Sequence, residues 1–218
     1  IRVEFDDFIL KEPSEVIQTQ EQEDSSPESD ILFEDDFSDH DSGWDILEDS
    51  DFSMGYRQEK YFIEIDTEDI TAWGNPYLDF DDVLIEADVQ PIQGPQDASY
   101  GLICRYLDGD NFYGFEISID GYYTIYKFEE GEFLEIVPWE YSDLVPQGFE
   151  NNRLAVKCQG QQLTFSVNGT LLAEATDSTY NHGDVAVLAA TYEDGDLVVE
   201  FDDFIVKEPW YTEKKVSN

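Results

Sequence analysis

The stretch VEFDDFIVKEP, Val199–Pro209, decides how the rest of this chain is interpreted. It has a near-identical copy, VEFDDFILKEP, at Val3–Pro13. The copies match at ten of eleven positions, and the exception is Leu10 against Val206. Ten matches in so aromatic and acidic a segment exclude chance recurrence. The offset of 196 residues, from 3 to 199, suits one domain plus a linker, so the pattern predicts one period of a tandem repeat.

Between the two copies, the chain is a series of short segments in which apolar and polar residues alternate. In KYFIEID, Tyr61, Ile63 and Ile65 alternate with polar neighbours, and residues 81–90 (DDVLIEADVQ) follow the same rule. Turn pairs such as Asn168-Gly169 separate many of the segments and suit two-residue hairpins. No window has a sustained helical period. We therefore predict an all-β, antiparallel β-sandwich (a jelly roll) of about a dozen strands, with an extra N-terminal strand and linker.

The composition divides the chain into four parts. Residues 1–12 read as the closing strand of a preceding repeat, and residues 13–30 as an acidic flexible linker that has too few large apolar residues to fold. Residues 31–208 form the jelly-roll domain. Residues 209–218 read as the start of the next linker or a tail.

The charge balance limits the classes of partner. Asp and Glu number 52 against 11 Lys and Arg, which gives a formal net charge of -41. Such a field repels phosphate backbones and anionic membranes, so we expect no nucleic-acid partner. No run of about 18 apolar residues occurs, so no membrane insertion is expected either. The charge does favour bound cations.

The two cysteines do not make a disulfide framework. Cys104 and Cys158 each lie in a strand pattern, where a lone cysteine behaves as a small apolar residue. We take this as the main interpretation. A single disulfide between them is the less favoured alternative.

Several segments resemble a known fold family. LFEDDFSDHDSGW, YGLICRYLDGDNFYGFEISIDGYYTIYKF, NRLAVKCQGQQLTFSVNG and GDVAVLAATYEDGDLVVEFDDFIV occur in an order that is similar to the concanavalin A-like lectin/glucanase jelly rolls. The nearest branch is the bacterial extracellular one related to laminin-G-like and 3-keto-disaccharide hydrolase-type domains. The resemblance implies two stacked antiparallel sheets in which the first and last strands are adjacent.

The same resemblance implies a structural Ca²⁺ that ties the first strand to the last. The matching positions are Asp36 and Asp202, with Asp6 as the equivalent in the partial copy. Asp35 and Asp203 lie next to these positions, so the matched ligands can shift by one residue to them. Carboxylate oxygens from adjacent strands are suitable ligands for this hard cation. The alternative is that these acids are a solvated face.

Glucanases of this kind carry three acids at two-residue spacing on one strand. Glu64, Asp66 and Glu68 in EIDTE have that spacing, and Glu64 with Glu68 would be the catalytic pair of a glycoside hydrolase. In a chain with 52 acids such a pattern arises easily, and the rest of the enzyme signature is missing. We therefore expect no enzyme activity, and keep hydrolysis as the least favoured alternative.

A sugar-binding surface is a stronger candidate, because aromatic rings stack on sugars while polar side chains fix the hydroxyl groups. The predicted carbohydrate-binding residues are Trp73, Tyr77, Arg105, Tyr113 and Trp139. Glu116 and Lys127 lie at nearby strand positions and are candidates for the same sheet face. The alternative is that most of these aromatic residues are core and that Arg105 forms a structural ion pair.

We thus predict a non-catalytic repeat unit of a secreted or cell-surface structural or adhesive protein. Its partners would be neighbouring copies of the same domain, and filaments would form through strand pairing by Val3, Phe5 and Phe8. The alternative function is a carbohydrate-binding, lectin-like module with a polysaccharide partner. Covalent tandem linkage is simpler than strand exchange, because the body already has its own closing strand.

Overall fold

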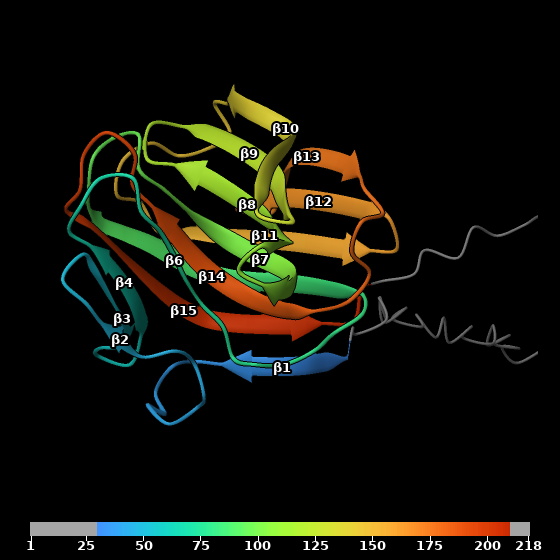
Figure 1. Cartoon of the computed structure of the whole chain (residues 1–218), viewed down its shortest axis with the longest axis horizontal. Coiled ribbons are helices and arrows are strands. Elements are labelled where there is room, and N and C mark those ends of the chain that lie inside the picture. Colours follow the sequence, from blue (N-terminus) through green and yellow to red (C-terminus); the bar gives the residue numbers. More distant parts are fainter. Residues whose placement is uncertain (1–29, 210–218) are drawn as a thin grey trace, which may run out of the picture.

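The computed structural model describes residues 30–209, which form fifteen strands and, within that range, no helix. The described residues thus include no helix long and apolar enough to cross a membrane. The strands build two stacked antiparallel sheets, one of nine strands and one of six, which confirms the predicted sandwich (Figure 1). The strands are β1 (Ile31–Asp35), β2 (Leu47–Glu48), β3 (Phe52–Tyr56), β4 (Tyr61–Ile65), β5 (Thr71–Gly74), β6 (Val83–Gln93), β7 (Ser99–Asp108), β8 (Asn111–Ser118), β9 (Tyr122–Glu129), β10 (Glu132–Tyr141), β11 (Asn152–Gln159), β12 (Gln162–Val167), β13 (Thr170–Thr176), β14 (Asp184–Ala190) and β15 (Leu197–Lys207).

The chain visits the two sheets in an interleaved order. The nine-stranded sheet runs β13-β12-β11-β6-β15-β4-β3-β2, with β1 also paired to β15. The six-stranded sheet runs β10-β9-β8-β7-β14-β5. Strands that are neighbours in space are therefore often distant in sequence, as is usual in a jelly roll.

The closing strand β15 lies in the middle of the nine-stranded sheet. One of its edges pairs with β6 along most of its length. The other edge pairs first with β4, through Leu197–Phe201, and then with β1, through Phe204–Lys207. The change of partner falls at Asp203, which has a φ of 46° at a register shift. The expected adjacency of the first and last strands is confirmed, since Asp35 of β1 lies opposite Phe204.

The alternation predicted from the sequence sets which side chains form the core. Tyr61, Ile63 and Ile65 of β4 are fully buried, whereas Phe62 and Glu64 between them are only half-buried. On β8, Tyr113, Phe115 and Ile117 belong to the same main cluster as the inward residues of the nine-stranded sheet. Each strand thus directs every second side chain into the space between the sheets.

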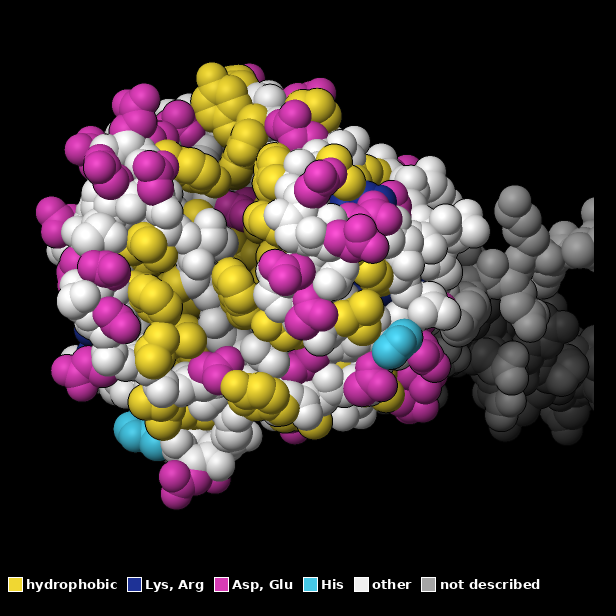
Figure 2. All heavy atoms as spheres, in the orientation of Figure 1, with side chains coloured by type: hydrophobic (Ala, Val, Ile, Leu, Met, Phe, Trp, Pro, Cys, Tyr) yellow, Lys and Arg dark blue, Asp and Glu magenta, His cyan; other side chains and the backbone are white. Residues whose placement is uncertain are grey.

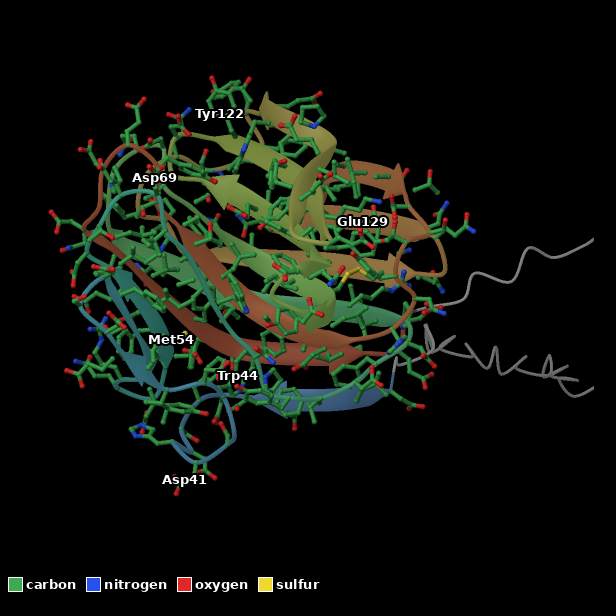
Figure 3. All side chains as sticks on the ribbon, viewed as in Figure 1. Asp41, Trp44, Met54, Asp69, Tyr122 and Glu129 are labelled. Carbon is green, nitrogen blue, oxygen red and sulfur yellow. A yellow bond between two sulfur atoms is a disulfide. The ribbon has the colours of Figure 1, made fainter. Side chains whose placement is uncertain are left out.

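A disulfide joins the two sheets. Cys104 of β7 and Cys158 of β11 are bonded, with their Cα atoms 6.8 Å apart, and the bond is drawn in yellow in Figure 3. This finding corrects the expectation of two unpaired cysteines. Their strands belong to different sheets and both residues point into the core, so stacking of the sheets brings the two sulfur atoms together.

The described domain begins and ends at the same place. The backbone N–H of Glu208 donates to the carbonyl oxygen of Asp30 at 2.9 Å, just beyond the paired ends of β15 and β1. The two ends of the described domain therefore lie side by side. The predicted strand-pairing residues Val3, Phe5 and Phe8, like Asp6, lie outside the described residues.

We expect reduction of the disulfide to lower the free energy of unfolding by about 2–4 kcal/mol, because the bond closes a long loop in the unfolded chain. Urea denaturation with and without reductant measures the difference. The double variant Cys104→Ala/Cys158→Ala is the control, and its unfolding should not respond to reductant. Reaction of both thiols with an alkylating agent in the unreduced, denatured protein would contradict the bond.

Candidate functional site

The outer face of the six-stranded sheet carries an apolar cluster. Side chains that point away from the main core pack there into a second buried group, with further aromatic rings laid against it. Its members are Ile103, Phe112, Tyr126, Ala186 and Leu188, and the rings against it are Trp73, Tyr106 and Phe128. Figure 2 shows hydrophobic side chains gathered along a hollow on the face in view, with acidic side chains around it.

The outer face of the nine-stranded sheet is different, because it carries ion pairs. Arg57 pairs with Glu64 at 3.1 Å, Lys60 with Glu200 at 3.4 Å, and Arg153 with Asp88 at 3.2 Å. A solvated, charged face of this kind contributes little to stability and is typical of an antiparallel sheet. The aromatic face on the other sheet therefore stands out as the candidate site.

Three adjoining pockets cross the aromatic face, and we name them together the aromatic groove. The Trp73 pocket has a volume of about 740 Å³, the Glu116 pocket about 350 Å³ and the Asp97 pocket about 210 Å³. Thr71 lines both the first and the second. Trp139 and Tyr192 line both the second and the third. The groove therefore runs from β5 across the sheet to β10.

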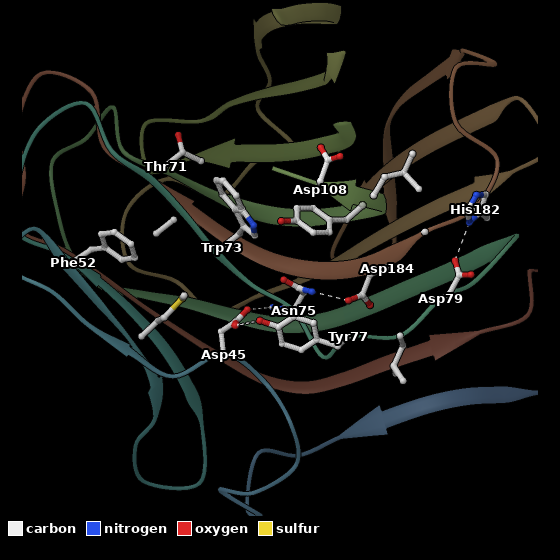
Figure 4. Close-up of a pocket in the computed structure, with 16 residues that line it drawn as sticks. Asp45, Phe52, Thr71, Trp73, Asn75, Tyr77, Asp79, Asp108, His182 and Asp184 are labelled. Carbon is white, nitrogen blue, oxygen red and sulfur yellow. Dashed lines mark hydrogen bonds and ion pairs between the residues drawn. The ribbon is translucent and has the colours of Figure 1, made fainter. Parts of the chain in front are cut away.

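The Trp73 pocket combines aromatic rings with fixed polar groups. The Trp73 ring lies 6.2 Å from that of Tyr106. The amide of Asn75 donates to Asp184 Oδ2 at 2.7 Å, and Tyr77 donates its hydroxyl hydrogen to Asp45. Figure 4 shows these polar side chains close together beside Trp73.

The electrostatics of the Trp73 pocket follow from burial and these hydrogen bonds. The hydrogen bond to Asp45 raises the pKa of Tyr77 to about 12, so its hydroxyl remains a donor. Burial raises the pKa of Asp184 above its ordinary value. A ring flanked by amide, carboxyl and hydroxyl groups is the combination that small-molecule sites use to orient a polar ligand.

The Glu116 pocket has a carboxyl group at its base. Glu116 is only 3% exposed, and Ser99 donates its hydroxyl hydrogen to Glu116 Oε2. The Tyr192 hydroxyl lies 3.1 Å from Ser99 Oγ and 3.5 Å from the same carboxyl oxygen. Burial raises the pKa of Glu116. Burial, and after it the charge of the Glu116 carboxyl, raises the pKa of Tyr126 and of Tyr192.

Aromatic rings form the walls of the Glu116 pocket. The rings of Trp139 and Tyr192 stand at 89° to each other, with centroids 6.4 Å apart. Phe133 of β10 packs against Tyr126 and Phe128, with ring centroids 4.9 Å and 5.7 Å apart, respectively. The pocket therefore presents several ring faces and one carboxyl group to whatever enters it.

The structure brings together three of the five predicted carbohydrate-binding residues. Trp73 and Tyr77 line the Trp73 pocket, and Trp139 lines the other two. Glu116, expected on the same face, is also there, but Lys127 is not, because it pairs with Glu129 and Asp177.

The other two predicted residues, Arg105 and Tyr113, lie inside the domain. Arg105 is 1% exposed, pairs with Asp82 at 3.1 Å and donates to the carbonyl oxygens of Gly160 and Tyr180. Tyr113 is fully buried and donates to Asp177 at 2.6 Å. We expected both residues on a sugar-binding surface, and the structure corrects this, since both side chains are buried inside the domain.

The three acids considered for hydrolysis do not meet the groove. Glu64 lies on β4, on the outer face of the nine-stranded sheet, in its ion pair with Arg57. Asp66 and Glu68 are exposed residues beyond the end of that strand. Their two-residue spacing therefore does not continue on one strand.

Asp36 and Asp202, the two predicted calcium ligands, have different surroundings. Asp36 is exposed and its carboxylate accepts from the backbone N–H and the hydroxyl of Ser38, whereas Asp202 lies opposite Asp88 of β6. Within residues 30–209, no group of three or more acidic, histidine or cysteine side chains is placed to hold a metal ion. Asp35 is used internally, since it accepts from Trp44 Nε1 at 2.9 Å. Asp35 and Asp36 line a pocket together with Asp203, and the calcium site stays a prediction from the resemblance.

Sequence reasoning missed Tyr192, Tyr126, Phe128, Asn75 and Asp45 as members of the groove. Tyr126 and Phe128 occupy outward positions of β9, a strand that is apolar on both faces. Apolar residues on both faces of a strand are the sequence signal that could have indicated an aromatic outer face. Tyr192, Asn75 and Asp45 lie between strands, where no periodicity marks them.

No protein-family model matches the sequence, and no curated protein matches it. The fold is similar to the carbohydrate-binding module CBM66 from Bacillus subtilis, with 16% identity and a TM-score of 0.62 over 76% of this chain and 96% of that one. It is also similar to a Bacteroides ovatus mixed-linkage glucan GH16 protein solved with a G4G4G3G product, at 13% identity and a TM-score of 0.58 over 81% and 100% of the chains. The Bacillus licheniformis β-glucanase is similar as well, at 11% identity and a TM-score of 0.54 over 82% of this chain and 98% of that one. At these identities the likeness establishes the fold, which confirms the jelly roll expected from the resemblance.

Replacing the buried acid should change how stability depends on pH. Because the folded pKa of Glu116 is raised, the folded protein binds more protons than the unfolded one, and stability falls as pH rises through the folded pKa. We expect Glu116→Gln to raise the urea midpoint at neutral pH, and the gain to shrink as pH falls towards the ordinary range of a glutamate. The exposed Glu174→Gln on β13 is the matched control and should show no such trend. A gain independent of pH would contradict the burial effect.

Proposed function

We propose that this domain binds polysaccharide along the aromatic groove. The observation that carries the proposal is the run of three adjoining pockets, which crosses the aromatic face and continues past its β5 edge to β3. Its aromatic lining includes Trp73, Tyr106, Tyr126, Trp139 and Tyr192. Ring faces spaced along a groove suit successive sugar units, and the amide and carboxyl groups between them suit hydroxyl groups. The carbohydrate-binding module and the glucanases named above support this proposal through their shared fold.

We further propose that the domain works outside the cell or on its surface. The disulfide between Cys104 and Cys158 supports this location, because such bonds form and persist in oxidising compartments. Extracellular polysaccharide is the partner available there.

Binding should depend on the tryptophans of the groove. We expect Trp73→Ala and Trp139→Ala each to weaken binding of a preferred glycan about tenfold, since loss of a buried ring contact costs about 1.5 kcal/mol. The control is Leu171→Ala, which removes an exposed apolar side chain from β13 of the other sheet. Calorimetry with ligands chosen from a glycan array measures the change. If the folded protein bound no glycan, the proposal would be wrong. If it released reducing ends from a glycan, the domain would instead be a hydrolase.

The repeated segment supports a second proposal, that the domain is one unit of a covalent tandem array. β15 is the described copy of this segment, and both of its edges are paired. Residues 3–13 would fill the same place in a preceding domain. Because the described domain begins and ends at one place, the linkers on both sides of each unit would attach to the same end of the domain. Such an array would bring many grooves to one polysaccharide, which would raise the avidity of the array for that polysaccharide.

We expect the chain of residues 1–218 to be a monomer in solution, because β15 already fills the place that a copy of residues 3–13 would take. Light scattering across a range of concentrations measures this. The shortened chain of residues 14–218 is the control and should behave identically. Dimers or longer species that vanish with the shortened chain would show strand exchange and overturn the covalent array.

A further inference from the structure

We propose that the Glu116 pocket selects a glycan that carries a protonated amine, so that the preferred ligand is an amino sugar with a free ammonium group. The inference rests on the proposed function, because it names the class of sugar that the groove would bind. Its basis is the pairing of a buried carboxyl group with several aromatic ring faces in one pocket.

The carboxyl group of Glu116 has no cationic partner in the part of the chain that the structure describes. Its hydrogen-bonding neighbours are the hydroxyl groups of Ser99, Tyr126 and Tyr192, which come from β7, β9 and the segment after β14. No Lys, Arg or His is among the described residues that line the pocket. Buried charges in proteins are paired or neutralised, so a cation that enters the pocket meets an acid ready to pair with it.

The few basic residues of the domain are engaged elsewhere. Arg57, Lys60, Arg153 and Lys207 form ion pairs with acids of the nine-stranded sheet. Arg105 is buried against Asp82. Lys127 pairs with Glu129 and Asp177, and Lys157 lies on β11 of the nine-stranded sheet. None of these residues lines the Glu116 pocket, so a ligand is the source of positive charge that the proposal assigns to it.

The walls of the pocket favour the same ligand. Trp139 and Tyr192 present perpendicular ring faces, and Tyr126 contributes a third ring beside the carboxyl. An ammonium group is attracted to ring faces, most strongly where water is excluded. A volume of about 350 Å³ lies within the range of small-molecule sites and has room for a sugar ring with its amine directed at Glu116.

The surroundings of the pocket strengthen the preference. Asp97 and Asp120 line the adjoining Asp97 pocket, and the chain as a whole has a formal net charge of -41. This field attracts cationic oligosaccharides and repels sugars that carry carboxylate or sulfate groups. Surface attraction alone is weakened by salt, whereas a buried pair is screened much less.

The test compares three β-1,4-linked tetrasaccharides that differ at one substituent: the free-amine glucosamine oligomer, its fully N-acetylated form, and the neutral glucose oligomer. Calorimetry is carried out at moderate and high salt, at a pH where the amine is protonated. We expect the free-amine oligomer to bind at least tenfold more tightly than the other two and to keep that preference at high salt.

The variants locate the preference. At high salt, the three oligomers should bind Glu116→Gln with equal affinity, whereas the matched control Glu174→Gln, which removes one exposed acid from β13, should keep the wild-type preference. If Glu116→Gln fails to fold, Trp139→Ala provides the second test. It leaves every charge in place and should weaken the free-amine oligomer at least fivefold.

Each other outcome is decisive. Equal affinity for the three oligomers in the wild type would overturn this inference and leave polysaccharide binding standing. A preference that disappears from the wild type at high salt would assign it to the acidic surface and overturn the inference. A preference that survives at high salt in Glu116→Gln would also overturn it, because Glu116 would not be its source. If none of these oligomers binds and a glycan array gives no ligand, the proposed function itself fails.

Discussion

The pairing of β15 along both of its edges is the constraint on which this domain depends. β15 separates β6 from β4 and β1, so the nine-stranded sheet is continuous only when the last strand is in place. Because β15 comes last in the sequence, its own pairings with β1, β4 and β6 are long-range, and long-range pairings are slow to form.

The two stacked sheets give the domain two unlike outer faces. The nine-stranded sheet uses its scarce Lys and Arg to pair with acids across neighbouring strands. The six-stranded sheet has aromatic rings there, with a carboxyl group buried among them. An exposed aromatic groove is costly in a soluble protein unless a ligand covers it. The unequal distribution of charge is therefore the clearest functional signal in the molecule.

Much of the fold was predictable from alternation and turn chemistry, as β4, β6 and β15 illustrate. The groove was predictable only in part. Trp73, Tyr77 and Trp139 were identified by residue type, but the same criterion selected Arg105 and Tyr113, which are buried. Residue type does not say which of the two faces of a strand is the core face when both faces are apolar. Glu116 shows the same ambiguity, since a lone acid in an apolar strand fits either a buried pair or a ligand site.

The sequence by itself determined the strands, their inward residues and the sandwich class, because a two-residue period and turn residues act locally. The adjacency of the first and last strands was implied by the resemblance to concanavalin A-like jelly rolls, not by these local patterns. Only the tertiary structure decided that Cys104 and Cys158 are bonded and that Glu116 lies among Tyr126, Trp139 and Tyr192. The disulfide joins strands from different sheets, and Tyr192 reaches Glu116 from a loop distant in the chain. The formation of these contacts depends on how two twisted sheets stack, and no local pattern encodes that stacking.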